Sequence, residues 1–334
     1  MNRALTNRSL FWPLLLVGAG IIGLLTNLGI FSYTNLSVLF RLWPFLLIVI
    51  GLYLLFGRRA PGLGTLFGLG TIAGVIGLML IGPALGWAAD VEVKSASYEE
   101  PLGDTTAAQI NLRPEIGDLT ITPLVDSNNL LAANVNYIGD VTFESTGTTD
   151  KVIGLSQTHG RSSIFDLGIL FNPDQRLDWQ VQLNPQAALA LNINTGTGSA
   201  KLDLSAFDRL TELVVNTGTG GIQLTLPAAE QPYQANITVG TGSGTVEIEA
   251  GAAVELIASS GTGGFTVDVP ADAAVRIEAS TGTGNLNVPA NFERQGDQNN
   301  FIGDNGVWET ANFTEADRQI VIKYSGGTGD LKIQ

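Results

Sequence analysis

The residues most suggestive of chemistry are glycine-rich turns, the first of which lies in NTGTGSAKLDL at residues 194–204. Loops of this kind cradle phosphate in nucleotide-binding proteins, where backbone N–H groups face the ligand. No turn here has the Gly-x-x-x-x-Gly-Lys-Ser/Thr pattern of a phosphate loop, and each turn opens a strand rather than a helix. A nucleotide site is usually single, whereas this turn recurs. We therefore interpret the turns as structural corners.

The predicted structural corners contain Gly196, Gly198, Gly218, Gly220, Gly240, Gly242, Gly261, Gly263, Gly282, Gly284, Gly327 and Gly329.

Carboxylates form a second set of candidates, because four of them alternate with apolar residues: Asp203, Glu247, Glu249 and Asp268. On one outer sheet, stacked carboxylates could bind Ca²⁺ or act on a glycan. The alternative is a solvated acidic face that resists aggregation, which we favour because other turns of the repeat place Thr225, Asn287 and Lys332 at the same positions.

The chain has no cysteine and a single histidine, His159, so a cysteine site or a multi-histidine metal site is excluded. His159 could act as a general base, but no serine or cysteine constellation points to it, and we expect it on the surface of a turn. We predict no catalytic residue, metal or cofactor, and therefore no enzyme.

The first 89 residues have the composition of a membrane domain, since no acidic residue precedes Asp90. Three apolar stretches are long enough to cross a bilayer as helices: Leu10–Phe31, Val38–Phe56 and Gly62–Trp87. The third is rich in glycine, which allows close helix contact either within this chain or with a partner helix. We predict a multi-pass domain over residues 1–89 in a cell membrane, with the lipid bilayer as its first partner.

Tryptophan-proline pairs and arginines are predicted to lie at the membrane interface: Trp12, Pro13, Trp43, Pro44, Arg58 and Arg59. Arginines before the first stretch and between the second and third indicate one cytoplasmic side. Three crossings then place the N-terminus in the cytoplasm and the C-terminal domain outside.

Residues 90–334 are strongly acidic, holding all 31 acids and 12 of the 17 basic residues, so nucleic-acid binding is not expected. The second glycine of the turn recurs at steps of 21 or 22 residues from Gly198 to Gly284, and Gly329 follows after about two periods. Gly117 and Gly139 are weaker upstream members, again 22 residues apart. Alternating apolar residues flank each turn, which indicates a half-buried strand on either side.

This repeat predicts a β-solenoid with about two short strands per rung, because stacked units bury a face that one unit cannot. A β-sandwich of hairpins is the alternative. Two aromatic stretches interrupt the pattern, near residues 161–185 and near 291–318. The first includes Trp179 and suggests an inserted hairpin or capping flap; the second is interpreted as a cap of the solenoid end or a partner-binding loop.

Residues 177–227 resemble the bacterial toast-rack β-repeat domains, on the basis of Trp179, the Gly-Thr-Gly turns and the Leu-Asp-Leu strand at 202–204. The paired Trp-Pro segments, at residues 12–13 and 43–44, resemble the LiaI/LiaF-like transmembrane region. The resemblance implies a membrane-bound, non-enzymatic protein and, in LiaF itself, a negative regulator of a cell-wall-stress sensor kinase. LiaF is understood to have four crossings and a cytoplasmic C-terminal domain, whereas three crossings are counted here.

Taken together, the sequence predicts a membrane-anchored protein of the bacterial cell envelope that acts by contact. Its predicted role is structural or regulatory, with envelope stress response as one such role. A membrane protein such as a sensor kinase is one expected partner, and self-association through solenoid ends is another. The alternatives are an adhesin-like surface scaffold and a glycan-acting β-helix enzyme.

Overall fold

The structure is a computed structural model that describes residues 11–31, 35, 38–39, 42–57, 61–85, 87, 93–158, 176–296 and 304–334. The described chain divides into two compact units, one helical and ending before residue 93, the other built of strands and beginning there.

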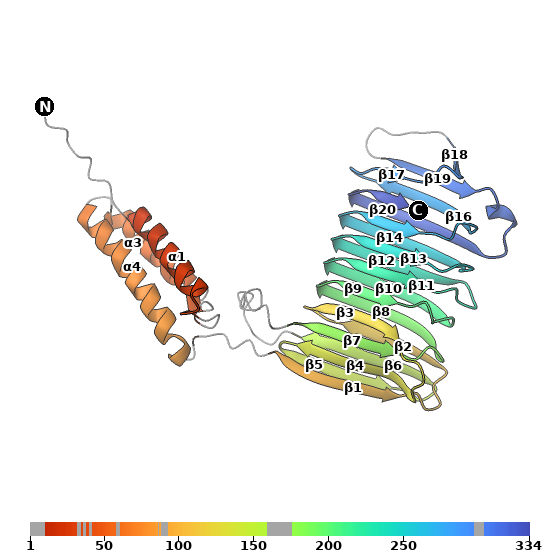
Figure 1. Ribbon diagram of the computed structural model, residues 1–334, viewed down its shortest axis with the longest axis horizontal. Coiled ribbons are helices and arrows are strands. Elements are labelled where there is room, and N and C mark those ends of the chain that lie inside the picture. The colour runs from red at the N-terminus through yellow and green to blue at the C-terminus, as the bar shows by residue number, and fades with distance from the viewer. Residues whose placement is uncertain are drawn as a thin grey trace. The chain divides into compact units, whose positions relative to one another are not determined.

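In the described part of the helical unit the helices are α1 (Phe11–Asn27), α3 (Trp43–Leu52) and α4 (Pro61–Ile81) (Figure 1). A π-helical turn, η1 (Tyr53–Gly57), extends α3, and a 3₁₀ turn, η2 (Pro83–Leu85), follows α4. Pro44 lies in the first turn of α3, where its missing N–H leaves no intrahelical bond unmade.

Small residues allow α1 and α4 to approach each other. A Cβ added to Gly18 would lie 2.6 Å from the Ile72 side chain, and one added to Gly68 would lie 3.1 Å from Leu14. By contrast, a Cβ at Gly74 or Gly77 would meet nothing within 4 Å. Only part of the glycine set of the third segment therefore serves contacts within the chain.

The predicted membrane spans are only partly matched by these helices. α1 has 17 residues and α3 has 10, both shorter than the apolar stretches that contain them. Within the described residues, no helix combines the length and the hydropathy needed to cross a membrane. The multi-pass domain therefore stays a prediction, as do its three crossings and the orientation that depends on them.

The β unit consists of two sheets of stacked strands, with one continuous hydrophobic core made by both (Figure 1). In spatial order, the described strands of the first sheet are β1 (Lys94–Pro101), β4 (Asn129–Tyr137), β7 (Asp178–Leu183), β3 (Asp118–Pro123), β9 (Ala200–Asp203), β11 (Ile222–Leu226), β13 (Gly244–Ile248), β15 (Phe265–Asp268), β21 (Leu331–Ile333) and β17 (Leu286–Asn287).

Those of the second sheet are β18 (Phe292–Gln295), β19 (Asn305–Thr310), β16 (Ala274–Thr281), β20 (Gln319–Thr328), β14 (Val254–Thr262), β12 (Tyr233–Thr241), β10 (Leu210–Thr219), β8 (Ala188–Thr197), β2 (Ala107–Arg113), β6 (Asp150–Thr158) and β5 (Asp140–Thr146).

Each rung is a strand of the second sheet, a glycine turn and a strand of the first sheet. Successive rungs pair in parallel at the predicted spacing, so that Val215 lies beside Ile237 and Ile237 beside Ala258. Alternate residues are buried, as in β12, where Ala235, Ile237 and Val239 point into the core. The all-β, solenoid-like prediction is thus correct, and two parallel faces replace the hairpins of the sandwich alternative.

The turns stack as two columns of glycine. A Cβ added to Gly220 would overlap the carbonyl oxygen of Gly198, and one added to Gly242 would overlap that of Gly220. These glycines have φ of 144° and 146°, a conformation that L-residues rarely adopt. The second-glycine column comprises Gly117, Gly198, Gly220, Gly242, Gly263, Gly329 and Gly284, and the first-glycine column comprises Gly196, Gly218, Gly240, Gly261, Gly327 and Gly282.

The upstream members of the repeat do not both form rungs. Gly117 belongs to the column, because the rung β2–β3 pairs directly with β8–β9. The expectation for Gly139 was wrong: it joins β4 to β5, and both strands form antiparallel pairs with neighbours. The glycine at 139 has φ of 82° and serves a different corner.

The first aromatic interruption is also not simply a flap. Trp179 lies in β7, a strand of the first sheet between β4 and β3, and its side chain is fully buried. Residues 159–175 lie outside the described part of the chain. The second interruption forms the antiparallel hairpin β18–β19, which pairs with the outer edge of β16 and packs Phe292 and Trp308 against the core.

Rung order departs from sequence order near the C-terminal end. β20 lies between β14 and β16, and β21 lies between β15 and β17. The doubled step before Gly329 therefore reflects a rung that returns and inserts between two earlier ones, after the hairpin β18–β19.

We expect Gly242→Ala to lower the free energy of unfolding of the β unit by about 3 kcal/mol, because the added methyl combines an unfavourable φ with overlap on the Gly220 carbonyl. Gly251→Ala is the matched control, since Gly251 also has positive φ, at 80°, but open space around it, and should lose only about 1 kcal/mol. Denaturant unfolding followed by circular dichroism measures both. Equal losses would show that stacking contributes nothing beyond φ.

Candidate interaction surface

The backbone of the glycine turns is fully engaged between rungs. The Gly198 N–H donates to the Thr219 carbonyl at 3.0 Å, and the Gly220 N–H donates to the Thr241 carbonyl at 2.9 Å. A phosphate cradle needs several N–H groups directed at the ligand. Here the same groups extend the ladder of the sheet around each corner, so the column offers no anion site.

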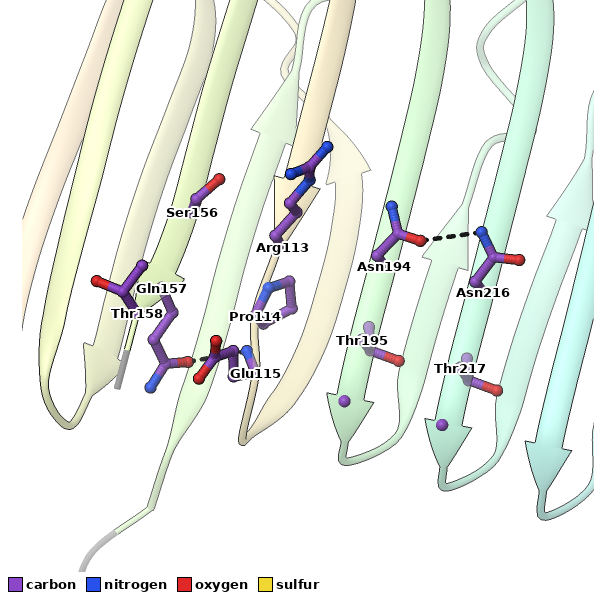
Figure 2. Close-up of a pocket in the computed structure, with 12 residues that line it drawn as sticks. Arg113, Pro114, Glu115, Ser156, Gln157, Thr158, Asn194, Thr195, Asn216 and Thr217 are labelled. Atoms are coloured by element: carbon purple, nitrogen blue, oxygen red, sulfur yellow. Dashed lines mark hydrogen bonds between the residues drawn. The ribbon is translucent and has the colours of Figure 1, made fainter. Parts of the chain in front are cut away.

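Gln157 closes the turn column at the end next to β6. Its side chain is buried, and its amide nitrogen donates to the Ile138 carbonyl at 2.9 Å. Its amide oxygen accepts from the N–H groups of Glu115 and Ile116, at 3.1 and 3.4 Å (Figure 2). A side-chain carbonyl thus stands where the backbone carbonyl of a further rung would be.

A groove lined mainly by residues with polar side chains, called the polar groove below, opens where β6 diverges from the rung β2–β3. It has a volume of about 550 Å³ and is lined by Arg113, Glu115, Ser156, Asn194 and Asn216, among others. Figure 2 shows Arg113 and Ser156 near the start of the groove and the two asparagines side by side on β8 and β10.

An amide ladder forms the floor of this groove. Asn194 donates to Asn192 at 2.8 Å, and Asn216 donates to Asn194 at 2.9 Å. Arg113 supplies a guanidinium, whose planar fork fits a carboxylate. The groove therefore presents one cation, one carboxylate and amide groups, a combination suited to hydroxyl- or carboxylate-bearing partners.

Three of the four predicted carboxylates lie in one row on the outer face of the first sheet. Asp203 and Glu247 each pair with Thr225, and Glu247 pairs with Asp268, whereas Glu249 lies just beyond the end of β13. Within the described residues, no group of three or more His, Cys, Asp or Glu side chains could hold a metal ion.

A charged cluster lies on the outer face of the second sheet near its C-terminal end. The Lys323 ammonium donates to Glu255 at 2.6 Å, and Arg276 donates to Glu278 and Glu309 at 2.9 and 3.0 Å. The hydrogen bond from Lys323 lowers the pKa of Glu255, and Glu255 in turn raises the pKa of Lys323. Arg276 and Glu309 are register partners on β16 and β19, and Lys323 reaches diagonally from β20 to Glu255 on β14.

The other sequence candidates are dispersed or lie beyond the described residues. Trp12 and Trp43 are each about half exposed, and Pro13 and Pro44 are exposed beside them. Arg58, Arg59 and His159 fall outside the described residues.

Sequence reasoning missed Arg113, Gln157 and the asparagine pair Asn194 and Asn216. The alternation Asn-Ile-Asn at 192–194 does predict outward amides. The groove itself depends on the pairing of β2 with both β6 and β8, which are distant from it in sequence. No local sequence pattern predicts that pairing.

We expect Gln157→Ala to reduce the free energy of unfolding by about 2 kcal/mol, because it leaves two backbone N–H groups and one carbonyl without their partner. Gln182→Ala, on the exposed face of β7, is the control and should change stability by less than about 0.5 kcal/mol. Urea unfolding of both variants gives the comparison. A loss at Gln157 no larger than at Gln182 would contradict the capping role.

Two family models match the chain. The LiaF transmembrane domain matches residues 11–95, and the N-terminal domain of toast_rack, DUF2154, matches residues 88–249. These matches confirm the resemblance predicted from the Trp-Pro segments and the glycine turns.

Solved structures similar to the chain come from bacterial proteins. A candidate cell adhesion protein from Clostridium sporogenes is 21% identical, with a TM-score of 0.48 over 72% of this chain and 99% of that one. A candidate adhesin from Bacteroides fragilis is 12% identical, with a TM-score of 0.32 over 73% of this chain and 97% of that one. No curated protein matches the chain.

Proposed function

We propose that this chain, which joins a LiaF-type transmembrane domain to a toast-rack domain, is a membrane-associated envelope protein that acts by contact and regulates the response to cell-wall stress. The observation that carries the proposal is the presence of both domains on one chain. A membrane protein, such as a sensor kinase, is the partner that this architecture favours.

A contact mechanism agrees with the chemistry of the β unit. The turn amides are engaged between rungs, and the outer carboxylates of β9, β13 and β15 form a row rather than a convergent pocket. Glycan hydrolysis needs two carboxylates flanking the scissile bond, with one protonated as the acid. Recognition through a polar groove needs neither, which is why regulation by contact is favoured over catalysis.

The polar groove around Arg113 is the surface through which we expect the partner to bind. It combines a guanidinium with the amide ladder of Asn194 and Asn216, and both are held by rigid strands. Charge complementarity would direct an acidic partner segment to Arg113, in a unit whose net charge is otherwise negative.

Deleting the gene should raise the basal output of a cell-wall-stress reporter, as expected of a negative regulator, and the wild-type chain should restore it. Arg113→Glu should restore it only in part, because the substitution reverses the charge of the groove. Lys332→Glu, which reverses an exposed charge on β21 outside this groove, is the matched control and should restore it fully. Unchanged reporter output after deletion would instead favour an adhesin-like scaffold without signalling.

A topology measurement tests the proposed orientation. We expect a periplasmic or extracellular reporter fused after Gln334 to be active, because three crossings and the arginine distribution place the β unit outside. A fusion after Met1 serves as the control and should be active only with a cytoplasmic reporter. Activity of the C-terminal fusion in the cytoplasm alone would contradict three crossings and give the arrangement attributed to LiaF.

A further inference from the structure

The rung β20–β21, residues 319–333, is inserted between two rungs that follow each other in sequence. β20 pairs in parallel with β14 on one side and β16 on the other, and β21 pairs with β15 and β17. We call residues 319–333 the inserted rung, and the space between β14–β15 and β16–β17 that it occupies the slot.

The two walls of the slot are in register with each other as well as with the inserted rung. Ile320 lies beside Val254 on β14 and beside Val275 on β16, and these two are 21 residues apart. Gly263 and Gly284 hold equivalent column positions on either side of Gly329. A separation of 21 residues is the normal step between adjacent rungs. The two walls therefore have the residue spacing of rungs that pair directly with each other.

The connection across the slot has the length of an ordinary connection. Residues 249–253 join β13 to β14, whose rungs are adjacent. Residues 269–273 join β15 to β16, whose rungs are two positions apart because the inserted rung lies between them. Five residues can span either one or two strand spacings, about 5 or 10 Å. The chain therefore tolerates the slot whether or not its own rung occupies it.

The side chains of the slot fit this particular rung. Tyr324 is buried in a row between Ala258 and Ala279, and its ring centroid lies 5.7 Å from that of Phe265 on the first sheet. Two alanines facing each other across the slot leave the volume that a tyrosine fills. On the outer face, Lys323 of the inserted rung pairs with Glu255 of the wall.

We propose that the inserted rung exchanges between two copies of this chain, each copy placing residues 319–333 in the slot of the other. Every contact within the slot, including both glycine columns and the Tyr324 and Lys323 contacts, is the same whether the rung comes from its own chain or from a second copy. Exchange thus joins two β units without a new interface. This inference is independent of the proposed stress-response role.

A second copy is the occupant that the slot favours over any other strand-forming segment. An unrelated strand could satisfy the backbone ladder, but a side chain at the corner would overlap the Gly263 carbonyl, which leaves room only for a glycine such as Gly329, whose φ is 145°. It would also have to supply an aromatic residue opposite Phe265. Residues 319–333 meet all three conditions.

Cysteine pairs test the exchange directly, because the chain has no cysteine of its own. Ser259 on β14 and Ser325 on β20 are register partners on the outer face of the second sheet. Full-length Ser259→Cys and full-length Ser325→Cys chains carrying different tags would be coexpressed, oxidised mildly and purified through both tags in turn. We expect a disulfide-linked heterodimer, several-fold more abundant than in the control pair.

The control pair is Thr238→Cys with Ser259→Cys, also register partners, whose hydroxyls are 3.2 Å apart, but on rungs that follow each other without a slot. Carrying Ser259→Cys and Ser325→Cys on one chain should give covalent dimers on oxidation, because exchange places each cysteine beside its register partner on the other copy. An intramolecular crosslink without covalent dimers would contradict the exchange. A heterodimer yield equal to that of the control pair would overturn the exchange.

Discussion

Backbone stacked on backbone at the glycine turns is the constraint on which the β unit depends. From Gly198 onward, each second glycine lies against the carbonyl of the glycine in the adjacent rung, too close for any Cβ. The same turns donate an N–H to the next rung, so spacing and direction are fixed together. Because side chains alternate with a period of two, a rung fixed at its corner also has its buried and exposed residues fixed.

That constraint also determines where function can reside. The amides that would bind phosphate are used to hold the rungs, which removes the chemistry that the turn motif first suggests. The parts of the stack that remain available for function are the outward-facing rows of side chains and the two ends. At the end next to β6, Gln157 completes the ladder with its side chain, and the strands that separate there leave the polar groove beside Arg113.

The rungs themselves were predictable from sequence, but their neighbours were not. Glycine spacing and the alternation of residues such as Ala235, Ile237 and Val239 are local signals, and both are reproduced in the structure. Gly139 carries the same local signal and forms another corner, because strand pairing, not the turn, decides what a rung contacts. Trp179 and Gln157 contact residues that are distant in sequence, and the spacing of the repeat does not predict those contacts.

Because the rungs are alike at their corners and pair in parallel, the backbone alone does not determine the order in which they stack. That order is determined by the side chains that meet between neighbouring rungs. At β20 the deciding features are Tyr324 between two alanines and the ion pair of Lys323 with Glu255. These select the rung that enters the slot but not the molecule that provides it. Order within one chain and joining of two chains are therefore controlled by the same few contacts.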